Sequence, residues 1–354
     1  MVTYFVTGCA GFIGTSFVHY LLKKHTDICI INLDKLTYAG NLENLNDIED
    51  DPRHIFVHGD ICDAQLVKSL IDKYDPDYII NFAAETHVDR SITNPEVFVT
   101  TNVMGTVNLL QRAKENWYDA GQKTWRSGKK YVQVSTDEVY GALGAEGYFT
   151  ETTPLDPHSP YSSSKSSADL FVKAFHDTYG MPVNITRCSN NYGPYQFPEK
   201  LIPLMINNVK NHKQLPVYGD GLQVRDWLFV EDHCKAIDMV ATGGRDGEVY
   251  NIGGHNERTN IFIVKTIISQ LAERLNDPQI NEGLIKHVED RLGHDRRYGI
   301  DPSKIKADLG WYPETPFEVG IVKTIDWYLD NQGWMERVTS GDYQKYYDEM
   351  YKNR

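Results

Sequence analysis

The sequence lacks any run of apolar residues long enough to cross a membrane. A membrane-spanning helix needs about 20 mostly apolar residues, and no stretch of this chain comes near that length. Positive charge is also scarce, because 36 Lys and Arg against 49 Asp and Glu leave a formal net charge of −13. Nucleic-acid-binding proteins need a basic face to neutralise phosphates, so that class is not expected. An anionic ligand would need cations gathered locally against this overall charge.

Cysteine is sparse too, since the chain holds only five, and no two of them are spaced Cys-x-x-Cys. The odd count and the spacing argue against a disulfide framework or a zinc site. His54 and His58 are four residues apart, but the Ile-Phe-Val between them is typical of a strand, so we expect no metal. The first residues are typical of a strand and a turn and not of a secretory signal. We therefore expect a cytoplasmic protein with free thiols and no membrane association.

Length and hydrophobic pattern predict an α/β protein. A chain of 354 residues is long enough for two domains or one large one, and 41% hydrophobic residues are ordinary for a globular protein. Short, nearly continuous apolar segments rich in Val, Ile and aromatics are typical of strands buried on both faces. They alternate with amphipathic segments such as 15–24 and 101–116, which predicts a Rossmann-like, doubly wound parallel sheet. The predicted strands cover residues 4–7, 28–33, 55–57, 78–83, 131–135 and 183–188.

The pattern changes after residue 190, where prolines at positions 194, 198, 203 and 216 interrupt the sequence. Residues 232–254 return to a helix followed by a strand at 248–252. We therefore expect a sheet domain and a smaller C-terminal domain interleaved with it. The sheet domain would contain residues 1–189 and 232–258, and the smaller domain residues 190–231 and 259–354.

Three glycines follow the first predicted strand and precede the first predicted helix. Such spacing allows a tight turn and lets the helix N-terminus face a pyrophosphate. Asp34 ends the second strand, where a carboxylate accepts hydrogen bonds from an adenosine ribose and repels a 2′-phosphate. This favours NAD over NADP, although Lys35 beside it keeps NADP open. Asp60, after the third strand, either reaches the adenine edge or is a turn residue. The glycines are Gly8, Gly11 and Gly14.

A Tyr-x-x-x-Lys pair, Tyr161 and Lys165, follows Ser159 and Pro160, which are a good N-cap and first residue for a helix. Four residues are about one helical turn, so both side chains are expected on one face. Bringing a Tyr pKa from about 10 to near 7 takes roughly 4 kcal/mol of preferential stabilisation of the phenolate. A Lys ammonium and a nicotinium charge are suitable sources. Such pairs are common on surface helices, but beside the glycine turn this one predicts a catalytic base.

Thr136, Asp137 and Glu138 follow the strand at 131–135. Ligands of doubly wound sheets bind beyond the carboxyl ends of the strands, so these side chains are expected beside the substrate. Adjacent carboxylates on an exposed turn would usually be solvated charges. Here they predict an acid and a base that together can remove water from adjacent carbons.

The motifs taken together resemble the extended short-chain dehydrogenases/reductases that act on sugar nucleotides. Within that family several stretches are similar to the dTDP-glucose 4,6-dehydratases, and the resemblance covers essentially the whole chain. Leu292 stands where the family usually has Pro, and the loop at 142–149 is short compared with some members. The stretches are STDEVYG at 135–141, AAETHVDRS at 83–91, CSNNYGPYQFPEKLIPL at 188–204, GLQVRDWLFVEDH at 221–233, YNIGGHNE at 250–257 and GHDRRY at 293–298.

The resemblance implies a hydro-lyase that turns dTDP-glucose into dTDP-4-keto-6-deoxyglucose for deoxysugar biosynthesis, such as that of dTDP-rhamnose. Tyr161, supported by Lys165, would take the proton of the glucosyl 4-hydroxyl, and Thr136 would hydrogen-bond that oxygen while hydride passes to NAD. Glu138 would remove the carbon-5 proton, and Asp137 would protonate the leaving 6-hydroxyl. Hydride would then return to carbon 6, carbon 5 would be reprotonated, and NAD would end as it began.

The matching motifs also imply contact residues, with NAD on the sheet domain and the nucleotide sugar on the smaller domain. Besides the three glycines, NAD would contact Phe12, Ile13, Asp34, Lys35, Leu36, Thr37, Asp60, Ile61, Ala83, Ala84, Thr101, Tyr161, Lys165 and Asn191. The nucleotide sugar would contact Thr86, Thr136, Asn190, Lys200, Leu201, Pro216, Val217, Tyr218, Arg225, Asn260, Arg291 and His294. Ordinary packing is an almost equal alternative for Leu201, Pro216 and Val217. The guanidinium of Arg225 suits a diphosphate, and Arg296 and Arg297 lie nearby in sequence.

Three other interpretations stay open at this point. A 4-epimerase of the same superfamily would need Tyr161 and Lys165 but no Asp137–Glu138 pair, because it eliminates nothing. A 4,6-dehydratase of another nucleotide sugar, such as GDP-mannose or UDP-N-acetylglucosamine, would share the catalytic residues. A non-catalytic dinucleotide sensor would need only the glycine turn. The family also implies a homodimer formed by the segments near 101–116 and 161–178, whose apolar faces alternatively pack inside the monomer.

Overall fold

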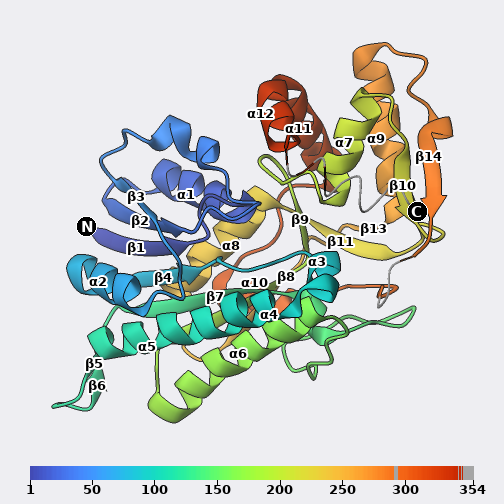
Figure 1. Ribbon diagram of the computed structural model, residues 1–354. Helices are drawn as coiled ribbons and strands as arrows, with labels where there is room; N and C mark the ends of the chain where they lie inside the picture. The colour runs from blue at the N-terminus through green and yellow to red at the C-terminus, as the bar shows by residue number, and fades with distance from the viewer. Residues whose placement is uncertain (291–293, 342, 344, 346–354) are drawn as a thin grey trace.

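Seven parallel strands form the main sheet of the computed structural model, which describes residues 1–290, 294–341, 343 and 345 (Figure 1). Their order is β3-β2-β1-β4-β7-β8-β12. The order reverses between β1 and β4, so the carboxyl ends of these two strands flank a crevice. The predicted doubly wound α/β fold is confirmed. The strands are β1 (Val2–Thr7), β2 (Ile28–Asp34), β3 (His54–His58), β4 (Tyr78–Asn81), β7 (Lys130–Thr136), β8 (Val183–Cys188) and β12 (Val249–Ile252).

Helices cover both faces of this sheet and bury its apolar side chains. One face packs against α1 (Phe12–Lys24) and α8 (Val230–Gly243). The other packs against α2 (Ala64–Tyr74), α5 (Thr106–Trp117) and α6 (Pro160–Tyr179), of which α5 and α6 lie side by side in Figure 1. Ser159 caps α6 as predicted, in a reciprocal capping box with Ser162.

The segment before α5 differs from the predicted single helix at 101–116. It begins with two short helices, α3 (Val88–Thr93) and α4 (Pro95–Phe98), and continues as the π-helix η2 (Val99–Gly105) before α5 starts. The predicted strand at 78–83 is also shorter, since β4 ends at Asn81 and the chain then turns along the crevice. Local sequence patterns fix helix and strand ends only to within a few residues.

A second region has its own small sheets and its own core. Its core includes Trp227, Phe229, Ile263, Ile321 and Trp334. The strands are β9 (Asn190–Tyr192), β11 (Val224–Phe229) and β13 (Glu257–Thr259) in one sheet, and β10 (Leu215–Tyr218) and β14 (Ile285–Val288) in another. The helices are α7 (Leu201–Lys210), α9 (Asn260–Leu275), α11 (Phe317–Asp330) and α12 (Gln332–Val338). Helix α10 (Ser303–Leu309) instead packs its Ile305 against the main sheet.

The remaining described elements are short. They are the helices η1 (Leu42–Ile48), η3 (Asp137–Tyr140) and η4 (Glu282–Leu284) and the hairpin of β5 (Tyr118–Asp119) and β6 (Thr124–Trp125). In the part of the chain that the structure describes, no helix is both long and apolar enough to span a membrane.

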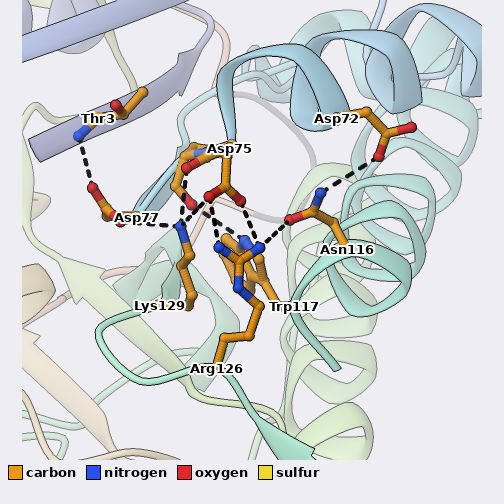
Figure 2. A network of polar contacts seen from close by, with 9 residues as sticks. Thr3, Asp72, Asp75, Asp77, Asn116, Trp117, Arg126 and Lys129 are labelled. Carbon is orange, nitrogen blue, oxygen red and sulfur yellow. Dashed lines mark hydrogen bonds and ion pairs between the residues drawn. The ribbon is translucent and has the colours of Figure 1, made fainter. Parts of the chain in front are cut away.

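The amino edge of the main sheet is held by a network of polar contacts (Figure 2). Lys129 Nζ, just before β7, donates to the Asp75 carbonyl at 2.9 Å and to Asp77 Oδ1 at 3.0 Å. Asp77 Oδ2 accepts from the Thr3 amide of β1 at 2.9 Å. Arg126 donates to both Asp75 carboxylate oxygens, at 2.7 and 2.6 Å. Strands β1, β4 and β7 are thereby joined at the edge opposite to the crevice.

Candidate active site

A cleft lies beyond the carboxyl ends of β1, β2, β4 and β7, where doubly wound sheets bind ligands. It unites the predicted glycine turn, the Tyr161–Lys165 pair and the segment Thr136-Asp137-Glu138, called the acid-base turn below, which come from separate parts of the sequence. The predicted residues that line it are Gly8, Gly11, Phe12, Ile13, Gly14, Asp34, Lys35, Thr37, Asp60, Ile61, Ala83, Ala84, Thr86, Thr101, Thr136, Asp137, Glu138, Tyr161, Lys165, Asn190, Asn191 and Lys200.

The glycine turn passes close to the neighbouring strand and opens the N-terminus of α1. Gly8 has a φ of +70°, and a Cβ there would lie 2.6 Å from the Ala83 amide nitrogen. Gly11 is the N-cap of α1, no side chain caps the helix, and its first turn carries no acidic residue. The first amides of the helix are therefore free of competing side chains, which fits the binding of a pyrophosphate.

Asp34 is held in place at the end of β2. Its Oδ2 accepts from the Ala10 amide at 2.8 Å and its Oδ1 from the Leu36 amide at 2.7 Å. A carboxylate offers about four acceptor positions, so each oxygen keeps capacity for a ribose hydroxyl. Lys35 Nζ pairs with Asp60 Oδ2 at 2.8 Å. Since Asp60 offsets the Lys35 charge, this lysine is a poor partner for a 2′-phosphate, and the geometry favours NAD.

Tyr161 and Lys165 lie one turn apart on α6, and both side chains are buried against the cleft. Burial raises the pKa of the Tyr161 hydroxyl, the Glu138 charge adds to the rise, and a hydrogen bond with Thr136 opposes it. Burial lowers the pKa of Lys165, whose Nζ donates to the Val134 carbonyl at 2.7 Å. These residues alone therefore hold the phenol protonated, and a further positive charge is needed for Tyr161 to act as a base.

The acid-base turn begins where β7 ends. Thr136 Oγ1 accepts from the Glu138 amide at 3.3 Å and so caps the short helix η3. Asp137 is 2% exposed, and burial, together with the Glu138 charge, raises its pKa well above the usual value. Among the described residues, its Oδ2 has no hydrogen-bond partner. A buried carboxylic acid that keeps its proton beside a more exposed carboxylate is the acid-base pair that an elimination requires.

The other predicted substrate residues lie outside this lining. Leu201 starts α7, Pro216, Val217 and Tyr218 lie on β10, and Asn260 starts α9. Arg225 on β11 donates to the Asp295 carbonyl at 2.9 Å, and its guanidinium lies 4.2 Å from the centre of the Tyr298 ring. His294 bonds Asp290 and approaches the Tyr218 ring. Leu36 also lies outside the lining, and Arg291 lies outside the described residues.

Two cations expected to enrich the diphosphate site are already paired. Arg296 bonds the Asp220 carboxylate at 2.8 and 3.1 Å, and Arg297 bonds Glu257 at 3.1 and 3.2 Å. Their charge is therefore offset locally. Arg225 is buried, and its guanidinium lies over the Tyr298 ring, which fixes its position.

The sequence reasoning missed several residues of the lining, including Glu85, Gln196 and Glu199. Glu199 is buried and accepts hydrogen bonds from the Tyr38 hydroxyl at 3.1 Å and from Arg90 Nε at 3.3 Å. Glu85 follows the end of β4, so the rule that ligands lie at strand ends was a usable signal for it. For Glu199 the signal was its place directly before Lys200.

Comparisons with known proteins agree with this geometry. The family model described as GDP-mannose 4,6 dehydratase matches residues 5–324. A dTDP-glucose 4,6-dehydratase of Xanthomonas campestris pv. campestris is 54% identical over 346 residues, which are 97% of this chain and 98% of that relative. The crystal structure of dTDP-glucose 4,6-dehydratase from Bacillus anthracis str. Ames in complex with NAD is 50% identical with a TM-score of 0.85, over 96% of this chain and 100% of that one. DesIV, the dTDP-glucose 4,6-dehydratase of Streptomyces venezuelae with NAD and TYD bound, is 46% identical with a TM-score of 0.87, over 95% and 100%. The chain belongs to the dTDP-glucose 4,6-dehydratases.

Proposed function

We propose that this chain is an NAD-dependent hydro-lyase that converts dTDP-glucose to dTDP-4-keto-6-deoxyglucose. The observation that carries the proposal is a single cleft that holds Tyr161 and Lys165 together with Asp137 and Glu138. An epimerase has no use for the second pair, and a dinucleotide sensor has no use for either. The family to which the chain belongs supports the same reaction and the same nucleotide sugar.

NAD fits the cleft through this chain's own groups. The uncapped start of α1 would hold the pyrophosphate, and Asp34 would hold the adenosine ribose. Bound NAD would supply a hydride acceptor and, at the end of the reaction, the hydride donor. Its nicotinium charge would also supply the positive charge that Tyr161 needs, since the pKa of this hydroxyl is raised by burial. Tyr161 would then take the proton from the glucosyl 4-hydroxyl, with Thr136 hydrogen-bonding the same oxygen.

The acid-base turn would carry out the loss of water. The ketone at carbon 4 acidifies carbon 5, and Glu138 would remove the carbon-5 proton. Asp137, kept protonated by burial, would give its proton to the departing 6-hydroxyl, which leaves as water. Return of hydride to carbon 6 and of a proton to carbon 5 would complete the reaction. The product class is then a 4-keto-6-deoxy sugar nucleotide, and its consumers would be reductases, epimerases or aminotransferases that act on a ketone.

The two regions would divide the binding of the two ligands. We propose that residues 1–189 and 232–258 bind NAD and that residues 190–231 and 259–354 bind the nucleotide sugar. The separate apolar core beneath β11, α7 and α9 supports a distinct second unit. Arg225 and Tyr218 belong to that unit and are predicted to contact the nucleotide. They lie outside the cleft lining and would be reached by the nucleotide part of the nucleotide sugar.

The direct test is to incubate the purified protein with a panel of nucleotide sugars and identify the products by mass spectrometry. We expect a 4-keto sugar from dTDP-glucose, visible also by its absorbance in alkali. Formation of dTDP-galactose instead would establish an epimerase, and conversion of only GDP-mannose or a UDP sugar would correct the substrate. In Glu138→Gln we expect elimination to be lost while partial reduction of bound NAD survives, and normal turnover by this variant would refute its assignment as the carbon-5 base.

We also propose that the protein is a cytoplasmic homodimer. Side chains of η2 and α6 leave an apolar patch with Val99 53%, Met104 59%, Leu170 57% and Phe171 43% exposed. A patch of this kind beside the paired helices α5 and α6 supports pairing with a second copy. All five cysteines are free, which is compatible with a reducing compartment. Leu170→Asp should turn a dimer into a monomer in light scattering, and a monomeric wild type would refute the pairing.

A further inference from the structure

A buried polar network lies behind the cleft and connects the two elements that carry the proposed catalytic residues. Asp169 lies on α6 one turn after Lys165, Arg187 lies on β8, and Tyr140 ends η3, which begins with Asp137. Asp169, Arg187 and Tyr140 are only 1%, 5% and 2% exposed. The lining of the cleft includes none of these three, so any effect they have on the reaction is exerted through other residues.

The Arg187 guanidinium bridges the two elements. Its Nε donates to Asp169 Oδ2 at 2.9 Å, and its Nη1 donates to the Tyr140 hydroxyl at 3.0 Å. The Tyr140 hydroxyl in turn donates to Asn251 Oδ1 at 2.8 Å. The strand register sets Arg187 beside Ser135 on β7 and beside Asn251 on β12. The bridge therefore spans three strands at the level where β7 ends.

A buried ion pair such as Arg187–Asp169 contributes little to the stability of a core. Removing two charges from water costs several kcal/mol per ion, and well-packed apolar residues at such places are often at least as stable. Burial raises the pKa of Asp169, and the charges of Arg187 and Lys165 oppose that rise. Without Arg187, the Asp169 carboxylate would depend on Lys165 and would draw its ammonium away from Tyr161. The arrangement is therefore better explained by positioning than by stability.

We propose that Arg187, with Asp169 and Tyr140, is a positioning network that holds the Tyr161–Lys165 helix and the Asp137–Glu138 turn in one fixed relation. The network fixes the position of Tyr161, the base for the 4-hydroxyl, relative to Asp137 and Glu138, the acid-base pair for carbons 5 and 6. Elimination can then follow oxidation without a rearrangement of the site. This inference rests on the proposed function, because it assigns the two elements to two successive steps.

The test compares Tyr140→Phe with the wild-type enzyme in single turnovers of dTDP-glucose. Phe keeps the ring that stacks on Phe149 at 5.0 Å but removes the hydroxyl that joins Arg187 to Asn251. We expect elimination to slow roughly tenfold and oxidation, followed by the absorbance of reduced cofactor, to slow less than about threefold. Reduced cofactor should therefore accumulate. The ratio of the two rates does not depend on the fraction of folded enzyme.

A second variant and a matched control accompany it. Arg187→Lys keeps a charge opposite Asp169 but loses the fork that reaches both partners, so we expect the same accumulation and an altered pH profile of oxidation. Tyr4→Phe also removes a buried hydroxyl, one that donates to Asp238 at 3.2 Å near the amino edge. It should keep the wild-type ratio of rates. Without substrate, the change in melting temperature of the double variant should differ from the sum of the changes in Tyr140→Phe and Arg187→Lys.

One result would overturn the inference, namely a wild-type ratio of the two rates in both Tyr140→Phe and Arg187→Lys. Equal slowing of both steps gives that same ratio and would indicate a purely structural role. A wild-type enzyme that forms no 4-keto product would instead refute the proposed function itself.

Discussion

The two edges of the main sheet use aspartate in opposite ways. At the amino edge, the two hydrogen bonds from Arg126 lower the pKa of Asp75, and Lys129 adds a second cation (Figure 2). At the carboxyl edge, burial and the neighbouring Glu138 raise the pKa of Asp137. The first carboxylate is kept charged because cations surround it. The second is kept protonated because it is removed from water and placed beside a like charge.

This difference separates stability from chemistry within one sheet. A paired carboxylate contributes to the free energy of unfolding and cannot donate a proton near neutral pH. A buried carboxylic acid can donate a proton, but its ionisation is disfavoured in the folded state. It therefore lowers the free energy of unfolding at any pH above the pKa that the group has in the unfolded chain. Mutations at the two edges should therefore have opposite consequences.

The largest effect is expected at the carboxyl edge, where Tyr161→Phe removes the proposed base for the 4-hydroxyl. General-base catalysis contributes roughly 10²- to 10⁴-fold, so the rate of cofactor reduction in a single turnover should fall by about that factor. The melting temperature should change little, because the ring is retained. Unchanged cofactor reduction would show that another group takes this proton.

At the amino edge, Lys129→Met should destabilise the fold without affecting the chemistry. The Lys129 side chain is 4% exposed, and its removal leaves acceptors of Asp75 and Asp77 without their donor. We expect a loss of about 2 kcal/mol in the free energy of unfolding by urea and an unchanged kcat of the folded enzyme. Lys68→Met is the control, since its pair with Asp72 is about half exposed on both sides, and it should cost under about 0.5 kcal/mol. Equal losses would remove the contrast between buried and exposed cations.

Asp137→Asn should stabilise the protein while it abolishes elimination. The folded-state pKa of Asp137 is raised, so its unfavourable ionisation reduces stability as the pH rises above the unfolded value of about 3.9. Asn does not ionise, and at neutral pH the variant should gain on the order of 1 kcal/mol. Thermal melts between neutral and acid pH should show the gain shrinking toward about pH 4. A variant that is less stable at every pH would contradict this account.

Asp75→Asn gives the smallest effect and the opposite sign. The folded-state pKa of Asp75 is lowered, so its stabilising contribution is present above the unfolded pKa and is lost as the pH falls through the folded value. Because the side chain is 45% exposed, solvent screens the pair, and the variant should lose about 0.5 kcal/mol at neutral pH. The loss should disappear in acid, where both proteins carry an uncharged group. A gain in stability would mean that the two edges do not differ as described.

The sheet was predictable because its signals are local. Continuous apolar runs, the glycine turn before α1 and the Ser159-Pro160 start of α6 each act within a few residues of the chain. The small sheets of the second region were not predicted, because strands such as β9 and β13 are three residues long and carry no periodicity. Local patterns do not specify such pairings, which depend on tertiary packing.

In the candidate site, too, some residues were predictable from local sequence and others depend on tertiary packing. Most of the proposed cofactor residues lie at or just after strand ends, so the order of elements alone brings them together. The proposed substrate residues of the second region include ones from β9, β10, β11, α7 and α9, whose mutual placement follows from packing. The pairing of Arg296 with Asp220 joins residues 76 positions apart, and no sequence pattern reveals that it offsets a charge expected to face the substrate.

The π-helix η2 limits where the chain tolerates a change of length. Asn102 within it donates to the Glu85 carbonyl at 3.0 Å and to Ser164 Oγ at 2.8 Å, while Leu109 on α5 is fully buried beneath the sheet. A π-helical turn holds an extra residue relative to an α-helical turn. Deleting one residue of α5 between these two anchors would rotate one against the other by about 100°. A deletion within η2 would instead be absorbed as its wide turn became an α-helical turn, so the chain should tolerate a one-residue deletion there better than one in the turn that follows.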